Sequence, residues 1–213
     1  MLIYAWSVNA TSLAADYRQA VTGSSLSTLP FIVESMENEN RLSVKIYSEL
    51  EQPYKDIVRI FTTLSNWCEF TPLHLNVKAC TYQQSGKDHQ LTLYLGRKFY
   101  QPPEDTHQIT YRFHLEQQDD TTMKVSMTAQ EGPLGTEAYQ LGIEAAEFNN
   151  KTLVRVSMAY TPSILSRLAT STYLATLGRN KVGFSVTGVD SLNQPIFISG
   201  VKAVIERNAM RYY

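Results

Sequence analysis

The sequence predicts an α+β fold in which a seven-stranded, curved antiparallel sheet wraps around a C-terminal helix. Three observations predict it: apolar and polar residues alternate strictly through 76–161, turn signals recur there at hairpin intervals, and apolar residues at helical spacing flank that stretch. Parallel strands need crossover connections of about a dozen residues or more, and the gaps here are shorter. The strands are therefore expected to form an antiparallel meander.

The first strand and the first helix precede the meander. Leu42, Val44 and Ile46 alternate with polar neighbours, which is the period of a half-buried strand. After Pro53, a residue whose fixed φ suits the first turn of a helix, apolar residues recur at helical spacing over 57–64. A strand followed by one helix is expected before residue 76.

Six more strands are expected within 76–161. The turn signals that separate them stand at 85–87, 102–105, 119–120, 132–135 and 149–150. Each strand shows one apolar face, and such a face must be covered by helices.

An inserted helix and hairpin are expected between the last long strand and the terminal helix. The run that follows Pro162 predicts a helix over 164–177, and the alternation in 182–198 predicts a small hairpin. The terminal helix is expected from Gly200 to Tyr213, about 20 Å long.

The composition excludes several classes of function. Of 213 residues, 43% are hydrophobic and 18% are charged, which argues against disorder. The net charge is −1, so no overall positive field attracts nucleic acid. No apolar run approaches the roughly 20 residues of a transmembrane segment. We expect a soluble body without a nucleic-acid partner.

The segment 1–29 is expected to be either a signal remnant or a flexible N-terminal segment, and the domain proper 30–213. Residues 1–15 are mildly apolar, with small residues at the −3 and −1 positions of a cleavage point after Ala14, but lack a basic start. The alternative is a poorly ordered N-terminus with a short helix near 13–17. The signal interpretation implies a periplasmic or secreted protein; otherwise the protein is cytoplasmic.

Cys68 and Cys80 are the only cysteines, twelve positions apart. In an oxidising compartment they would form a disulfide; in a reducing one they would remain buried thiols. Zinc is disfavoured, because Cys68, His74 and Cys80 lack both the usual spacing and a fourth ligand. We predict the disulfide, and neither a metal site nor a cofactor.

The order of elements resembles the START-like helix-grip superfamily, which includes lipid-transfer domains, polyketide cyclases and plant pollen-allergen-type proteins. The resemblance is topological and covers residues 40 to 213. It implies one START-like domain with a hydrophobic cavity between the sheet and the terminal helix. The inserted helix and hairpin depart from that pattern, as does the short terminal helix.

At a finer level, 67–80, 132–136 and 206–213 are similar to an uncharacterised bacterial family within or beside that superfamily. This resemblance implies no catalytic residue, and we predict none.

The predicted ligand site combines large side chains of the sheet with two polar groups of the terminal helix. Its residues are Tyr111, Phe113, Met127, Tyr139, Met158, Tyr160, Arg207 and Asn208. A short helix would leave apolar volume unfilled, and an enclosed apolar void accepts an apolar guest. We therefore expect a pocket of a few hundred Å³, unless Trp67, Phe184 or the helix from Ile164 fills it.

The leading functional hypothesis is binding or transport of a lipid-like or aromatic small molecule in that cavity. One alternative is an enzyme of the cyclase or dehydratase kind, with His74 or Glu144 as the acid or base. The other is a protein-interaction module with a filled core. We favour the binding protein without chemistry of its own.

Overall fold

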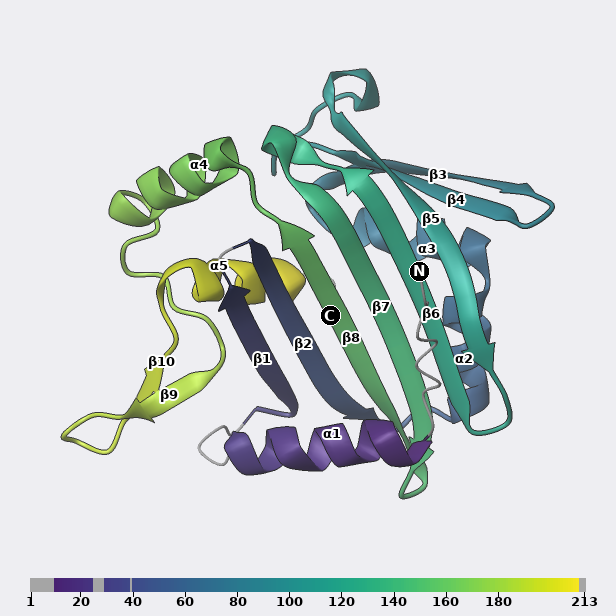
Figure 1. Cartoon of the computed structure of the whole chain (residues 1–213), viewed down its shortest axis with the longest axis horizontal. Helices are drawn as coiled ribbons and strands as arrows, with labels where there is room; N and C mark the ends of the chain where they lie inside the picture. The colour runs from purple at the N-terminus through teal and green to yellow at the C-terminus, as the bar shows by residue number, and fades with distance from the viewer. Residues whose placement is uncertain (1–9, 25–28, 39, 211–213) are drawn as a thin grey trace.

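One eight-stranded antiparallel sheet forms the centre of the molecule (Figure 1). The computed structural model describes residues 10–24, 29–38 and 40–210. The strands run in the order β1-β2-β8-β7-β6-β5-β4-β3. Their bounds are β1 Phe31–Asn38, β2 Arg41–Leu50, β3 Val77–Ser85, β4 Asp88–Leu95, β5 His107–Gln118, β6 Thr122–Glu131, β7 Glu137–Phe148 and β8 Lys151–Thr161.

The antiparallel α+β architecture is confirmed, but the expected number of seven strands is wrong. The additional strand is β1, which pairs with β2 along its whole length, with Val33 opposite Ile46. Glu34, Ser35 and Glu37 interrupt the apolar alternation that identifies the other strands. The edge of β2 supplies the hydrogen bonds that hold β1, so its formation depends on a neighbour rather than on its own pattern.

The six strands expected within 76–161 are β3 to β8, each paired with the next along the chain. A two-residue turn joins β7 to β8, where Asn149 and Asn150 have φ of 51° and 62°. Asparagine tolerates this left-handed conformation, and two such residues in succession give the hairpin turn whose twist matches the strands.

Two helices follow β2 where one was expected. α2 (Tyr54–Thr62) and α3 (Leu64–Phe70) are separated at Thr63, which has an extended backbone with ψ of 111°. The side-chain amide of Asn66 donates to the carbonyl oxygens of Arg59 and Ile60, at 3.1 and 3.2 Å. This contact lets the chain change direction, so the second helix covers strands that the first does not reach.

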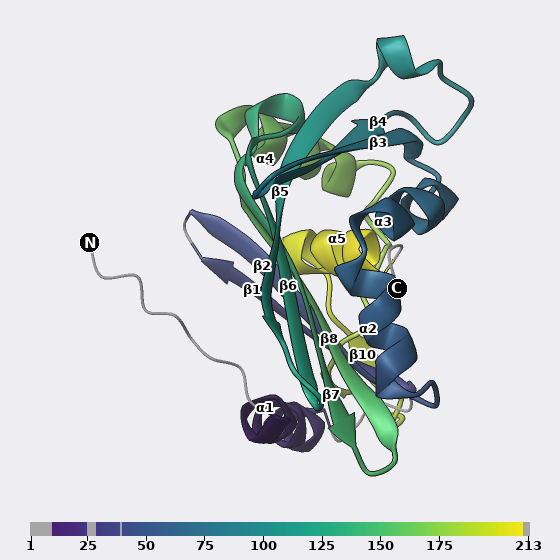
Figure 2. The ribbon, with the colours of Figure 1, turned by 90° about the vertical axis from the view of Figure 1, so that its right-hand side faces the viewer.

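The helices lie on both faces of the sheet. Figure 2 shows α2, α3 and α5 (Gly200–Ala209) on one side, here called the inner face, and α1 (Ala10–Gly23) on the other, the outer face. The terminal helix contacts β1 and β2, whereas α2 and α3 contact the strands from β3 to β8. The sheet therefore has separate helical covers at its two ends.

The helix α1 is fastened to the outer face. Leu13 is fully buried there beside Tyr47 and Leu153. The guanidinium of Arg155 also forms ion pairs with two carboxylates. Its nitrogens lie 2.5 Å from Oδ2 of Asp16 in α1 and 2.6 Å from Oε2 of Glu144. Residues 1–9 and 25–28 of the segment expected to be a signal remnant or flexible lie outside the described residues.

The expected insertion is present between β8 and the terminal helix. It consists of α4 (Ile164–Ala175) and the hairpin of β9 (Val186–Val189) and β10 (Pro195–Phe197). Among the described residues, no helix is long and apolar enough to span a membrane. Three short 3₁₀ turns complete the described elements. η1 (Thr71–Leu73) follows α3, η2 (Pro103–Asp105) precedes β5, and η3 (Pro133–Gly135) follows β6.

Candidate functional site

Six of the eight predicted site residues lie on the inner face of the sheet. They alternate with outward-facing residues on four neighbouring strands, which places their side chains on one surface. These residues are Tyr111 and Phe113 of β5, Met127 of β6, Tyr139 of β7, and Met158 and Tyr160 of β8.

Three of the six belong to a filled core. Tyr111, Phe113 and Met127 are almost completely buried beneath α2 and α3. The indole of Trp67 lies edge-on to Phe113, with ring centroids 6.2 Å apart. Trp67 thus fills this part of the inner face, as one of the sequence-based alternatives supposed.

The other three lie in a strip of half-buried apolar side chains between the two helical covers. We define the apolar seam as Tyr139 and Leu141 of β7 with Val156, Met158 and Tyr160 of β8. Tyr139 and Leu141 pack against the core under α2 and α3, Met158 and Tyr160 against the core under α5, and Val156 against both. The seam is the surface that neither cover buries completely.

Stacked tyrosine rings form one part of the seam. The rings of Tyr139 and Tyr160 are 5.2 Å apart and tilted by 13°, and Tyr111 lies edge-on to Tyr139 at 6.4 Å. The hydroxyl of Tyr139 is 2.7 Å from Oγ1 of Thr136. A side chain at Gly132 would overlap the Tyr139 ring, so glycine is required there.

Burial disfavours ionisation of both seam tyrosines. Desolvation raises the pKa of Tyr139, against a smaller lowering by the hydrogen bond with Thr136. Desolvation, together with the neighbouring Tyr139, raises the pKa of Tyr160 to about 12. Both hydroxyls therefore remain protonated at neutral pH, and the seam offers polar atoms without charge.

The terminal helix is held by a buried carboxylate rather than by apolar contact alone. Glu206 is 0% exposed. It accepts hydrogen bonds from the hydroxyls of Ser35 and Ser185 at 2.6 and 2.7 Å, and from the backbone N–H groups of Phe184 and Ser185 at 2.7 and 3.0 Å. These four bonds tie α5 to β1 and to the segment before β9, and so position the α5 side of the seam.

Arg207 and Asn208 do not join the six inner-face residues. They line a separate pocket of about 230 Å³ together with Lys98, Tyr173 and Lys181. The guanidinium of Arg207 donates to the carbonyl oxygen of Val182 at 3.2 Å. The predicted site is thus divided between two places, because Glu206 is the polar residue that α5 turns inward.

Two pockets of the described residues contain none of the six inner-face residues. The first of these is the one beside Arg207. The second, of about 140 Å³, lies among Gln90, Thr110 and Arg112, on the face of the sheet opposite to Tyr111 and Phe113. A pocket of a few hundred Å³ along the seam stays a prediction.

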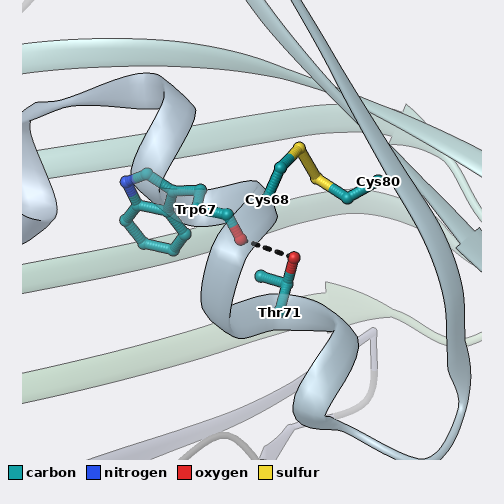
Figure 3. The surroundings of a disulfide bond; sticks show 4 residues. All are labelled: Trp67, Cys68, Thr71 and Cys80. Atoms are coloured by element: carbon teal, nitrogen blue, oxygen red, sulfur yellow. Dashed lines mark hydrogen bonds between the residues drawn. A yellow bond between two sulfur atoms is a disulfide. The ribbon is translucent and has the colours of Figure 1, made fainter.

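A disulfide joins α3 to the edge strand β3. Cys68 and Cys80 are bonded, with their Cα atoms 5.1 Å apart (Figure 3). Trp67 points away from the disulfide on the same helix, and the hydroxyl of Thr71 donates to its carbonyl oxygen at 2.6 Å. The bridge thereby helps to hold the indole over the filled part of the inner face.

The two acid–base candidates do not meet at the seam. Glu144 faces the outer side of the sheet, where it pairs with Arg155. His74 lies between η1 and β3, and its Nδ1 accepts the backbone N–H of Asn76 at 3.0 Å, which fits a structural histidine. The described residues contain no group of three His, Cys, Asp or Glu suited to a metal ion.

The sequence patterns did not identify all residues of the apolar seam or of the pocket beside Arg207. Leu141 and Val156 belong to the seam, and the alternation of their strands was a signal that could have found them. Tyr173 and Lys98 join Arg207 only through the tertiary fold, and no local pattern links these distant positions.

No protein-family model and no curated protein matches the chain. A STAR-related lipid transfer protein from Xanthomonas axonopodis is similar in structure, with a TM-score of 0.50 and 15% identity over 70% of this chain and 88% of that one. The aromatase/cyclase Zhui from Streptomyces sp. R1128 has a TM-score of 0.46 and 10% identity over 66% of this chain and 86% of that one. Norcoclaurine synthase from Thalictrum flavum has a TM-score of 0.44 and 14% identity over 71% of this chain and 84% of that one.

The resemblance predicted from the order of elements agrees with the similarity to the lipid transfer protein. The match with the lipid transfer protein has a TM-score of 0.50 over 70% of this chain, at 15% identity. Identity this low is evidence for the fold alone. The chain has the START-like helix-grip fold.

Proposed function

We propose that the protein binds a hydrophobic small molecule, lipid-like or aromatic, along the apolar seam. The observation that carries the proposal is the strip of half-buried apolar side chains between two separately anchored helical covers. A ligand that covers this strip removes apolar surface from water, which is worth about 25 cal/mol per Å². The similarity in fold to a lipid transfer protein supports the same function.

The chemistry of the seam favours a ligand that is uncharged along most of its length. None of the five seam side chains carries a charge at neutral pH, and the two tyrosine hydroxyls stay protonated. An ionised group placed against them would lose its hydration without gaining a partner of opposite charge. Aliphatic chains and aromatic rings have no such cost.

A buried hydroxyl near one end of the seam is suited to a polar group of the ligand. Ser48 of β2 is 2% exposed, and its hydroxyl has no hydrogen-bond partner among the described residues. Val154, opposite Ser48 in the sheet, is two residues from Val156 of the seam. A hydroxyl or carbonyl of a ligand would satisfy this hydroxyl.

Fluorescence titration tests the proposal. A fluorescent fatty-acid analogue and an aromatic dye, anilinonaphthalene sulfonate, serve as probes of the two ligand classes. We expect saturable binding of at least one probe by the wild type, and at least about tenfold weaker binding by Met158→Asp, which places a charge in the seam. Saturation by the fatty-acid analogue alone would favour a lipid.

Ile196→Asp is the matched control, because Ile196 is a partly exposed strand residue of the hairpin outside the main sheet. It should bind like the wild type. Folding of each variant is checked by far-ultraviolet circular dichroism. The proposal fails if the folded wild type binds neither probe, or if folded Met158→Asp binds as tightly as the control.

A further inference from the structure

The inserted helix α4 exposes its apolar side chains and turns polar ones toward the protein. Ile164, Leu165 and Leu168 are 57% to 89% exposed, whereas the buried residue of the helix is Ser166. A surface helix normally does the reverse, with an apolar stripe that faces the core. An uncovered apolar helix face of this kind marks a surface for interaction.

The chain segment that carries this face has charges of one sign. No Asp or Glu occurs from Phe148 to Val189, while Arg167, Arg179 and Lys181 follow one another in and after α4. Lys181 lies over the ring of Tyr173, 5.2 Å from its centre. The exposed apolar face is therefore accompanied by cations and by no carboxylate of its own segment.

A second exposed group lies at the same end of the molecule. In the connection between β4 and η2, Phe99 is 62% and Tyr100 is 89% exposed, directly after Arg97 and Lys98. Figures 1 and 2 both show this connection and α4 at one end of the structure, and Lys98 lines the same pocket as Tyr173 of α4. Glu104 and Asp105 follow in η2, so the excess of positive charge lies mainly on α4 and the segment after it.

We propose that α4 and residues 97–100 dock on the surface of a lipid bilayer that contains anionic lipid. Exposed leucine and isoleucine beside arginine and lysine, with neighbouring aromatic rings, suit a helix that lies in the membrane interface. Anionic lipid complements the cations, and the acyl chains receive the apolar face.

A second copy of the chain fits this surface less well than a bilayer. Two α4 faces brought together would oppose cation to cation, and like charges across an interface are unfavourable. A protein partner would need an apolar groove bordered by acidic groups, whereas an anionic membrane presents both features over its whole surface. The docking does not depend on the ligand proposed above.

Vesicle flotation tests the docking with the full chain. We expect binding to vesicles of phosphatidylcholine and phosphatidylserine in equal amounts, weaker binding to phosphatidylcholine alone, and a loss of binding as salt is raised. Leu165→Ser/Leu168→Ser should weaken binding at least about tenfold. Arg167→Gln/Arg179→Gln/Lys181→Gln should lower the preference for anionic vesicles by about fivefold for each cation.

Leu192→Ser/Ile196→Ser removes two exposed apolar side chains from the hairpin and is the matched control, which should float like the wild type. Circular dichroism shows whether each variant is folded. The proposal is overturned if the wild type does not float, or if the α4 and hairpin variants float equally. It is also overturned if light scattering shows a wild-type dimer that Leu165→Ser/Leu168→Ser dissociates while vesicle binding is unchanged. The probe titration of the seam is made without vesicles, so either proposal can fail alone.

Discussion

The two covers of the inner face are attached by different kinds of interaction. α2 and α3 lie on a core of aromatic and aliphatic side chains, and the Cys68–Cys80 disulfide adds a covalent bond to the sheet. α5 lies on a smaller core and is held by the four hydrogen bonds of Glu206. The first cover seals its half of the sheet, and the second leaves the seam beside it half exposed. A ligand is thus expected at the border of the cover that depends on one polar group.

The largest effect is expected from removal of the Glu206 carboxylate. Glu206→Ala should lower the free energy of unfolding by about 4 kcal/mol, because buried hydroxyl and backbone donors lose their acceptor. Urea denaturation measures it. Arg207→Ala, at an exposed neighbour in the same helix, is the control and should cost less than about 0.5 kcal/mol. Equal losses in the two variants would show that the carboxylate does not anchor α5.

The disulfide of the other cover is expected to contribute somewhat less. Cys68→Ser/Cys80→Ser should lower the free energy of unfolding by about 3 kcal/mol, the value for a loop of similar length. Reduction of the wild type should reproduce the loss, and the double variant, which has no bridge, should not respond to reductant.

The same bridge bears on where the protein resides. We propose an exported, oxidising location, which the disulfide supports. Titration of freshly isolated native protein under denaturing, non-reducing conditions should detect no free thiol. Two reactive thiols per chain would contradict the proposal.

Alkaline titration should reveal the protected environment of the seam. Tyr160 has a pKa raised from 10.0 to about 12 by burial and by Tyr139. The protonated hydroxyl therefore contributes stability that is complete below pH 10 and is lost as the pH rises towards 12. Absorbance at alkaline pH should show that Tyr160→Phe removes a late-ionising tyrosine. Tyr100→Phe controls for the loss of one chromophore, and an identical titration curve for the two variants would contradict the assignment.

The smallest effect is expected at Ser48. Ser48→Ala should raise the free energy of unfolding by about 1 kcal/mol or less, because a buried hydroxyl without a partner is removed. The same variant should bind the fatty-acid analogue more weakly if this hydroxyl contacts the polar group of the ligand. Unfolding curves and the probe titration measure the two effects, and a substantial loss of stability would mean that the hydroxyl has a partner in the folded protein.

The alternation of apolar and polar residues predicted much of the sheet. It predicted little of which site residues are buried in the core and which lie in the half-exposed seam. The alternation on the four strands β5 to β8 placed six site residues on one face, because a strand exposes successive side chains on opposite sides. It could not tell that Phe113 is sealed under Trp67 while Met158 remains half exposed. That difference depends on where α3 and α5 lie on the sheet, which no spacing along the chain encodes.

By itself, the sequence determined the antiparallel meander, the inserted helix and hairpin, and the terminal helix, since each has its own hydrophobic period. Only the tertiary structure decided that β1 joins the edge of β2, that Glu206 and not Arg207 faces inward, and that α4 leaves its apolar side chains exposed. The physical reason is that these features depend on partners from distant segments. A carboxylate can be buried only where donors from elsewhere in the chain converge on it, and a helix face is covered only where another surface meets it.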